Sequence, residues 1–284
     1  MQFTELTNVS PEIIRATQAM GFTDMTEIQE KAIPLMLAGH DMIAKAPTGT
    51  GKTMAFGLPI IERMDRESEA VQALILAPTR ELAMQITQEL REVAVCHEGV
   101  RVVCLYGGEP IGKQINALKR RPQIVVATPG RLMDHMKRRT VRLDKVQTVV
   151  LDEADRMLDM GFIHDVRRVL KVLPEHKQTL FFSATMPPEV QGLVDSLLHN
   201  PVKVAVDPIS SPVEVIDQKL YYVDRGNKTR LLAALIRELD VKNALVFTRT
   251  KHGANKVAGD LVKAGISAAA IHGNKSQTAR QQAL

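Results

Sequence analysis

The chain of 284 residues is 45% hydrophobic and 24% charged, an ordinary globular composition that excludes disordered, collagen-like and coiled-coil proteins. The sequence has no apolar run long enough to span a membrane and starts without a secretory leader, so we expect neither export nor a membrane partner. Its net charge of +5 is moderate, and two cysteines without the spacing of a zinc site favour a reducing, cytoplasmic compartment.

Seven short runs rich in β-branched residues alternate with amphipathic stretches through the first two hundred residues. Most of these runs are apolar on both faces, as in Val149-Val150-Leu151, which predicts parallel strands covered by helices on both sides. The expected fold is therefore a doubly wound α/β sheet. The predicted strands are Asp41–Ala46, Val71–Ala77, Arg101–Tyr106, Gln123–Ala127, Gln147–Asp152, Gln178–Ser183 and Val202–Val206.

Residues 46–53, Ala-Pro-Thr-Gly-Thr-Gly-Lys-Thr, lie between the first predicted strand and an apolar helical run. Glycines let successive backbone N–H groups close around an anion, and the N-terminus of the next helix adds positive potential. This indicates a phosphate-binding loop, although the strict motif has glycine in place of Ala46. Lys52 is expected to reach the β- and γ-phosphates, and the Thr53 hydroxyl to ligate Mg²⁺. The expected nucleotide-binding residues here are Ala46, Thr48, Gly49, Thr50, Gly51, Lys52 and Thr53.

Three of the later predicted strands are each followed by a predicted helix start, which presents free backbone N–H groups. Two of these three helix starts also contain an arginine. Such ends suit the phosphates of a nucleic-acid backbone better than base edges, which predicts little sequence specificity. Taken singly, each segment is more often a helix start without a ligand. The three segments are Pro78-Thr79-Arg80, Gly107-Gly108 and Thr128-Pro129-Gly130-Arg131.

Basic residues are concentrated after residue 100. Ten of them lie between Lys113 and Lys145, where the acidic residues are Asp134 and Asp144. This density could pair with a phosphate backbone, and it is equally compatible with a solvated helix face.

An acidic cluster, Asp152-Glu153-Ala154-Asp155, follows the fifth predicted strand at the carboxyl edge of the sheet, where α/β folds bind ligands. Asp152 is expected to hold Mg²⁺, and Glu153 to polarise the water that attacks the γ-phosphate. Alone, the cluster would indicate an acidic helix start, but the phosphate-binding loop favours a catalytic interpretation. With Lys52, these two acids form the expected catalytic set.

A segment rich in proline and serine, residues 207–216, interrupts the alternation and predicts a linker between two domains, residues 1–206 and 217–284. The second domain has only three predicted strands and ends inside a helical pattern. We therefore expect it to be truncated, with a small complete domain as the alternative. Its predicted elements are the strands Gln218–Val223, Ala244–Thr248 and Ser267–Ile271, the helices Lys228–Asp240 and Gly253–Ala264, and a helix opening near Ser276.

The phosphate-binding loop and the acidic cluster together resemble those of the DEAD-box RNA helicases, whose RecA-like domains are parallel α/β sheets that bind ATP and RNA. Upstream, Phe3, Gly21-Phe22 and Ile28-Gln29 resemble that family's adenine-reading motif, so Gln29 is expected to hydrogen-bond the adenine edge. Met25 stands where the family usually has proline. The resemblance extends over nearly all of the chain.

The same resemblance assigns the three helix starts to single-stranded RNA. It implies that Asp155, Ser183 and Thr185 couple the nucleotide state to domain closure, with the two hydroxyls hydrogen-bonded to the acidic cluster. Without the other motifs, Ser183 and Thr185 would indicate a turn that caps a helix. In the second domain, Gln277 and Arg280 match a Gln-x-x-Arg element that contacts RNA.

The family's next segments, which include a His-Arg-x-Gly-Arg stretch with arginine fingers, are absent from the sequence. Arginine fingers are worth about 10³ to 10⁵ in rate in other phosphoryl-transfer systems. We therefore expect this chain to hydrolyse ATP weakly or not at all.

Three functions are compatible with these motifs. The first is an ATP-dependent RNA helicase that uses ATP and Mg²⁺ to unwind short duplexes, the second an ATP-gated RNA clamp that releases no strand, and the third a DNA-directed motor. An aromatic content of 4% favours contact with the backbone of single-stranded or short duplex RNA over stacking on bases. The resemblance also suggests ribosome-assembly or RNA-decay proteins as partners.

Overall fold

The computed structural model describes residues 1–198, 200–206 and 217–283. The chain divides into two compact units, Met1–Ser211 and Pro212–Leu284. The predicted linker at 207–216 lies outside the described residues, so the domain boundaries stay a prediction.

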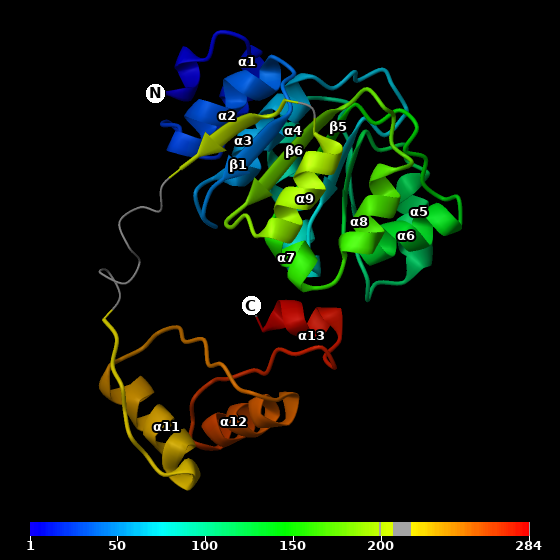
Figure 1. Cartoon of the computed structure of the whole chain (residues 1–284). Helices are drawn as coiled ribbons and strands as arrows, with labels where there is room; N and C mark the ends of the chain where they lie inside the picture. The colour runs from blue at the N-terminus through cyan, green and yellow to red at the C-terminus, as the bar shows by residue number, and fades with distance from the viewer. Residues whose placement is uncertain (199, 207–216, 284) are drawn as a thin grey trace. The chain divides into compact units, whose positions relative to one another are not determined.

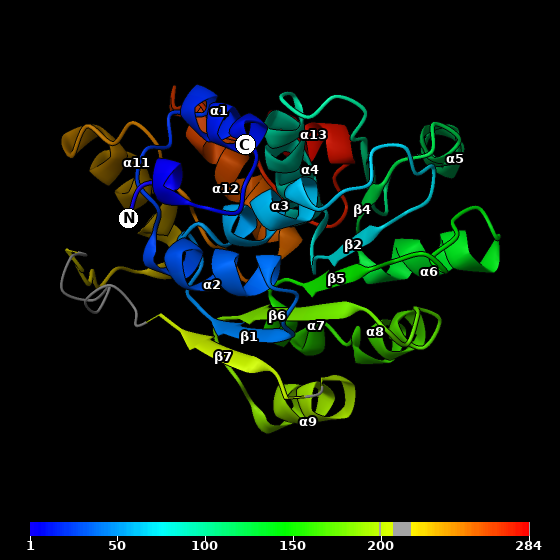
Figure 2. The ribbon, with the colours of Figure 1, turned by 90° about the horizontal axis from the view of Figure 1, so that it is seen from above.

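The first unit is built on a seven-stranded sheet in the order β3-β4-β2-β5-β6-β1-β7, and all pairings between these strands are parallel (Figure 2). This confirms the predicted α/β fold and all seven predicted strands of this unit, six of them one to three residues shorter than expected. The strands are β1 (Met42–Lys45), β2 (Ala73–Leu76), β3 (Val102–Leu105), β4 (Ile124–Ala127), β5 (Thr148–Leu151), β6 (Gln178–Ser183) and β7 (Val202–Ala205).

Helices cover both faces of this sheet (Figure 1). A short 3-10 helix, η1 (Phe3–Glu5), precedes the group on one face, which comprises α1 (Pro11–Ala19), α2 (Glu27–Leu37), α3 (Lys52–Glu62) and α4 (Arg80–Ala94). The helices packed on the other face are α5 (Ile111–Leu118), α6 (Pro129–Lys137), α7 (Ala154–Asp159), α8 (Ile163–Leu170) and α9 (Pro188–Leu197).

Two hydrophobic cores result because successive residues of a strand point to opposite faces of the sheet. On β6, Leu180 and Phe182 pack in the core beneath α1 to α4, whereas Phe181 packs in the opposite one. The ring of Phe182 meets that of Phe56 on α3 edge to face, with centroids 5.3 Å apart. Strands that are apolar on both faces are thus buried on both, as their sequences predict.

All strands run parallel, so the loops that follow them gather at one edge of the sheet, the carboxyl edge. Neighbours β2 and β5 end level, with Leu76 opposite Leu151. Asp152, the residue directly after β5, extends this pairing, because its backbone N–H donates to the Leu76 carbonyl oxygen at 3.0 Å. The loops after these two strands therefore leave the sheet side by side.

A polar cluster attaches α1 to the helices beside it. Ser10 Oγ donates to Glu62 Oε2 at 2.7 Å and lies 3.3 Å from Nε2 of His97, a buried histidine that follows α4. Burial, together with the nearby Arg66, holds the pKa of His97 below its ordinary value, although Glu62 acts in the opposite direction. His97 is therefore neutral in the folded chain at neutral pH.

We expect the chain to lose stability as the pH falls below about 6.5, because the unfolded chain then takes up a proton on His97 that the folded chain does not bind. Because the pKa of His97 is lower in the folded than in the unfolded chain, the free energy of unfolding decreases as the pH falls. Urea unfolding between about pH 5.5 and 7.5 measures the effect, and His97→Asn should reduce the dependence by up to one proton. His40→Asn, at an exposed histidine, should leave it unchanged. Equal pH profiles for wild type and His97→Asn would contradict this assignment.

The second unit contains the 3-10 helix η2 (Arg225–Asn227) and the helices α11 (Lys228–Glu238), α12 (Lys251–Lys263) and α13 (Gln277–Gln282). The three predicted helices are confirmed, including the last, for which Ser276 is the N-cap and its side chain accepts from the Ala279 N–H. Among the helices of the described residues, none combines the length and apolar character needed to cross a membrane.

The three strands predicted in the second unit, Gln218–Val223, Ala244–Thr248 and Ser267–Ile271, are wrong, since residues 217–283 form no strand. Tyr222 and Phe247 each leave 92% of their surface exposed. A strand satisfies its backbone N–H and C=O groups only through a neighbouring strand. These segments have the residue types of strands but no partner within this part of the chain.

Candidate functional site

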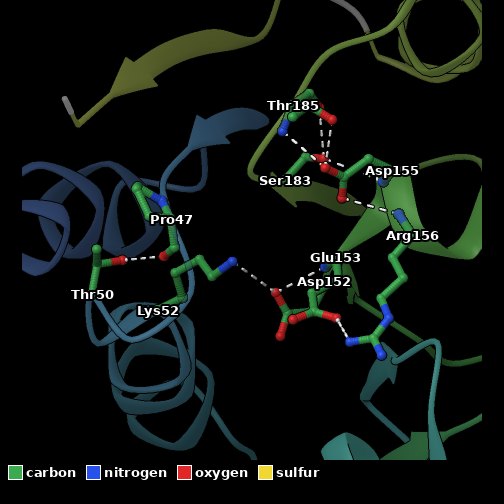
Figure 3. A network of polar contacts seen from close by, with 9 residues as sticks. All are labelled: Pro47, Thr50, Lys52, Asp152, Glu153, Asp155, Arg156, Ser183 and Thr185. Atoms are coloured by element: carbon green, nitrogen blue, oxygen red, sulfur yellow. Dashed lines mark hydrogen bonds and ion pairs between the residues drawn. The ribbon is translucent and has the colours of Figure 1, made fainter. Parts of the chain in front are cut away.

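The phosphate-binding loop connects β1 to α3 at the carboxyl edge. Gly49 and Gly51 adopt left-handed conformations, with φ of 83° and 87°, which favour glycine. Thr50 Oγ1 donates to the Pro47 carbonyl oxygen at 2.8 Å and closes the turn (Figure 3). Gly51 is the N-cap of α3, whose first N–H groups have no partner within the helix. The loop therefore presents the backbone donors and helix terminus that bind phosphate.

Lys52, the first residue of α3, is buried with 7% of its surface exposed. Its Nζ makes no hydrogen bond to the described residues, and the carboxylate oxygen Oδ1 of Asp152 lies 3.9 Å away. Figure 3 shows the side chain of Lys52 pointing toward that carboxylate. A buried ammonium without hydrogen bonds is unfavourable unless a ligand completes its shell. The site thus fits an anionic group such as a phosphate.

Gln29 links the start of α2 to the phosphate-binding loop. Its Oε1 accepts from the Thr26 N–H at 2.9 Å, and its Nε2 donates to the Gly51 carbonyl oxygen at 3.1 Å. A Cβ on Gly51 would lie 2.5 Å from that Nε2, so the close approach requires glycine. The amide still has a second N–H and further lone pairs for a ligand. Thr26 was missed from the sequence, although Thr26 and Gln29 form a capping box.

Asp152 and Glu153 follow β5 on the other side of the site. Asp152 is 3% exposed, and burial raises its pKa to about 6 against the opposing attraction of Lys52. Glu153 is the N-cap of α7 and has a left-handed backbone, with φ of 51°. Its Oε2 accepts from Arg156 Nη1 at 3.0 Å. Sequence reasoning missed this ion pair, for which the (i, i+3) spacing of opposite charges was the available signal.

Asp155 is held by residues that follow β6. Its Oδ2 accepts from the Thr185 backbone N–H at 2.9 Å and from Thr185 Oγ1 at 2.7 Å, while its own N–H donates to Ser183 Oγ at 3.2 Å (Figure 3). Burial acts to raise the pKa of Asp155, but the bonds from Thr185 and Ser183 outweigh it and hold the pKa below its ordinary value. The predicted contact between these hydroxyls and the acidic cluster is present.

The predicted nucleic-acid contacts lie after the neighbouring strands β2, β3 and β4. Thr79 caps α4, since its Oγ1 accepts from the Leu82 N–H at 3.2 Å. The guanidinium group of Arg80 covers Gly107 and Gly108, and a Cβ on Gly108 would lie 2.4 Å from Arg80 Nη1. The glycine pair therefore makes room for Arg80 at the edge of the sheet.

The segment from Thr128 to Arg131 completes this group, because it leads from β4 into α6. Arg131 Nη1 donates to the Glu109 carbonyl oxygen at 3.0 Å, which ties it to the loop after β3. Pro78 precedes the Thr79 cap, while Pro129 and Gly130 start α6. Gln277 and Arg280 belong to α13 of the second unit.

Two halves of the carboxyl edge thus carry two sets of candidate residues. The phosphate loop, the acidic cluster and the Ser183 turn follow β1, β5 and β6, whereas the three predicted nucleic-acid segments follow β2, β3 and β4. Gly107-Gly108, predicted as a helix start, is instead a turn, because α5 begins only at Ile111 after the Pro110 N-cap. The halves meet where β2 pairs with β5. The described residues contain no group of three or more His, Cys, Asp or Glu side chains that could hold a metal. Thr53 and Asp152 stay the predicted Mg²⁺ ligands, since Mg²⁺ usually keeps several waters and needs few protein ligands.

Comparison with known proteins gives consistent matches. Residues 26–193 match the family described as "DEAD/DEAH box helicase". An "ATP-dependent RNA helicase CshA" from Listeria monocytogenes is 44% identical over 283 residues, covering 100% of this chain and 54% of that protein. The Bacillus subtilis "DEAD-box ATP-dependent RNA helicase CshA" is 43% identical over 277 residues, covering 98% and 56%. The chain thus spans about half the length of these curated relatives.

Among solved structures, a DEAD box protein from the hyperthermophile Methanococcus jannaschii matches with a TM-score of 0.69. The two are 38% identical, and the match covers 99% of this chain and 76% of that one.

Proposed function

Because the chain belongs to the DEAD/DEAH box helicase family, we propose that it binds and hydrolyses ATP to remodel or locally unwind RNA. One observation carries the proposal most directly. The buried Lys52 ammonium lies beside Asp152 at a glycine-lined helix start, without a hydrogen bond from the described residues. Similarity to proteins named ATP-dependent RNA helicase supports RNA as the other ligand.

In the proposed site, Gln29 binds the adenine edge, and the backbone N–H groups of the loop bind the phosphates. Lys52 contacts the β- and γ-phosphates, which gives its buried ammonium the partner it lacks. Thr53 and Asp152 hold Mg²⁺, which would neutralise negative charge on the phosphate oxygens. The further loop residues that take part are Ala46, Thr48, Gly49, Thr50 and Gly51.

Glu153 orients and deprotonates the water that attacks the γ-phosphate. Its carboxylate is bound by Arg156, so in the proposed reaction it exchanges this ion pair for the water. The pair lies partly at the surface, with Arg156 56% exposed, and exposed ion pairs are weak enough to exchange readily. The left-handed backbone at Glu153 is the kind of strained geometry that persists at functional sites.

Asp155, Ser183 and Thr185 couple the nucleotide to the position of the second domain. They join the end of β6 to the start of α7, which directly follows Glu153. A change at the γ-phosphate would thus pass to the segment that leads toward the second unit. The supporting observation is that both oxygens of the Asp155 carboxylate accept hydrogen bonds, Oδ2 from Thr185 and Oδ1 from the Arg156 N–H.

RNA binds through its backbone at the three segments that follow β2, β3 and β4: Pro78-Thr79-Arg80, Gly107-Gly108 and Thr128-Pro129-Gly130-Arg131. Helix N-termini and the guanidinium groups of Arg80 and Arg131 are suited to phosphates and read no base sequence. In the second domain, Gln277 and Arg280 would contact the same strand. Weak turnover by this chain, a cytoplasmic location, and ribosome-assembly or RNA-decay partners stay predictions.

ATP hydrolysis by the chain should be stimulated by single-stranded RNA and not by single-stranded DNA of the same sequence. Because turnover is expected to be slow, the measurement uses labelled ATP with the protein in excess. Equal stimulation by DNA would favour a DNA-directed motor. RNA that binds with ATP, together with a short duplex that never separates, would favour the clamp. No binding of ATP at all would contradict the proposal.

A further inference from the structure

A cavity of about 490 Å³ opens at the amino edge of the sheet, opposite the site described above. Its walls are the segment 68–71 before β2, the end of α5 with Arg121 and Pro122, and the segment 140–145 before β5. Three of the lining residues are cations: Arg121, Arg142 and Lys145. We refer to it as the amino-edge cavity.

The cations of this cavity are free to exchange partners. Arg121 pairs with Glu69 and Arg142 with Asp144, but all four side chains are at least half exposed. Surface ion pairs of this kind are weak. A guanidinium group binds phosphate through two parallel hydrogen bonds, so a phosphate competes well with either carboxylate.

Cations outnumber carboxylates around the cavity, whose lining also contains Glu69 and Asp144. Lys119 and Arg120 at the end of α5, and Arg138 and Arg139 at the end of α6, are exposed on the chain segments that lead into its walls. Cations at a helix C-terminus are favoured by the helix dipole, which explains one or two such residues in each last turn. It does not explain the cations that follow in the loops.

Two of these arginines have a backbone that disfavours them. Arg121 and Arg139 have φ of 56° and 54°, in the left-handed region where the ends of helices usually have glycine or asparagine. Arginine occupies both positions despite this strain. Local departures of this kind are typical of functional positions.

The two edges of the sheet lie within reach of one nucleic-acid strand. Pro122 of the cavity and Thr128 of the proposed RNA site flank β4, six residues apart, or about 20 Å of extended chain. That distance corresponds to about six stacked nucleotides. At the carboxyl-edge end of this path, Lys113 in the first turn of α5 is exposed.

From these observations we propose that the amino-edge cavity binds backbone phosphates of the RNA beyond the segment held at the carboxyl edge. The inference rests on the proposed function, since it takes RNA as the ligand. It assigns to Arg121, Arg142 and Lys145 a second, sequence-independent contact that lengthens the RNA footprint of the first domain. An acidic protein segment is the competing occupant.

The test compares RNA affinity for strands of about 6 and about 20 nucleotides, with a non-hydrolysable ATP analogue and at several salt concentrations. In the triple variant Arg121→Gln, Arg142→Gln, Lys145→Gln, affinity for the long strand should fall roughly tenfold or more near 0.1 M salt. Its salt slope should fall by about 2. Affinity for the short strand should stay unchanged.

The matched control is Arg15→Gln, Lys31→Gln, Lys203→Gln, which removes the same charge from α1, α2 and β7. It should change neither affinity nor slope by a comparable amount. A second variant, Arg121→Gly, relieves the left-handed arginine and should fold at least as stably, yet weaken binding of the long strand.

Loss of long-strand binding that is equal in the triple variant and the control would overturn the inference and leave the proposed function intact. Displacement of poly-glutamate from wild type but not from the triple variant, with RNA binding unchanged, would also overturn it and identify an acidic protein as the occupant. Failure of the wild-type chain to bind RNA of either length would instead contradict the proposed function itself.

Discussion

Lys52→Gln is expected to weaken ATP binding by about 10- to 100-fold, because a hydrogen bond to a charged group contributes about 1.5 to 3 kcal/mol. The ammonium is buried, has no hydrogen bond from the described residues and lies 3.9 Å from the Asp152 carboxylate, so the phosphates would be its main partner. Glutamine keeps much of the side-chain volume but has no charge. Hydrolysis should fall further, by about 10² to 10³, because the lysine also stabilises negative charge in the transition state.

Titration with a fluorescent ATP analogue measures the affinity, and single-turnover hydrolysis measures the rate. Lys203→Gln is the matched control, since it removes one charge from an exposed position on the edge strand β7, outside the phosphate-binding loop. It should behave as wild type. If Lys52→Gln bound nucleotide as tightly as wild type and remained folded, the phosphates would lie elsewhere and the proposed nucleotide site would be wrong.

Glu153→Gln should leave ATP affinity nearly unchanged and lower the rate of hydrolysis by about 10² to 10⁴, the usual contribution of a general base. The amide is close in shape to the carboxylate but cannot accept the proton of the attacking water. Because Glu153 contacts Arg156 and not the phosphate loop, binding and catalysis should separate cleanly in this variant. The single-turnover rate with saturating ATP, with and without single-stranded RNA, measures the effect.

Asp159→Asn is the comparison for this variant, because it removes the same charge from an exposed position at the end of the same helix, α7. Its rate should match wild type. A Glu153→Gln rate within a few-fold of wild type would show that another group activates the water, and the strained conformation of Glu153 would then need a different explanation.

Sequence patterns predicted the first unit well because its strands are buried on both faces. Runs such as Val149-Val150-Leu151, short and rich in β-branched residues, suit a central parallel strand covered by helices. The segments around Tyr222 and Phe247 have a similar composition and form no strand. Composition reports the tendency of a segment to be extended, but pairing depends on a partner elsewhere, which a local pattern does not contain.

The sequence predicted which residues form the candidate site, but it did not predict most of the contacts between them. Glycine spacing identified the loop at 46–53, yet the bond from Gln29 to the Gly51 carbonyl joins residues 22 positions apart. The left-handed backbone of Glu153 and the raised pKa of Asp152 likewise follow from packing around β5. The capping box between Thr26 and Gln29 and the ion pair between Glu153 and Arg156, by contrast, each had a signature within four residues of sequence.

The level ends of β2 and β5 have a consequence for how two ligands would communicate. The Asp152 N–H is bonded to the Leu76 carbonyl, and only three residues separate Leu76 from Arg80. If Asp152 holds the metal and Arg80 the RNA, as proposed, a displacement at Asp152 would reach the start of α4 through one backbone hydrogen bond and three residues. Communication between the two sites would then depend on neighbouring backbone segments and would require no long chain of interacting side chains.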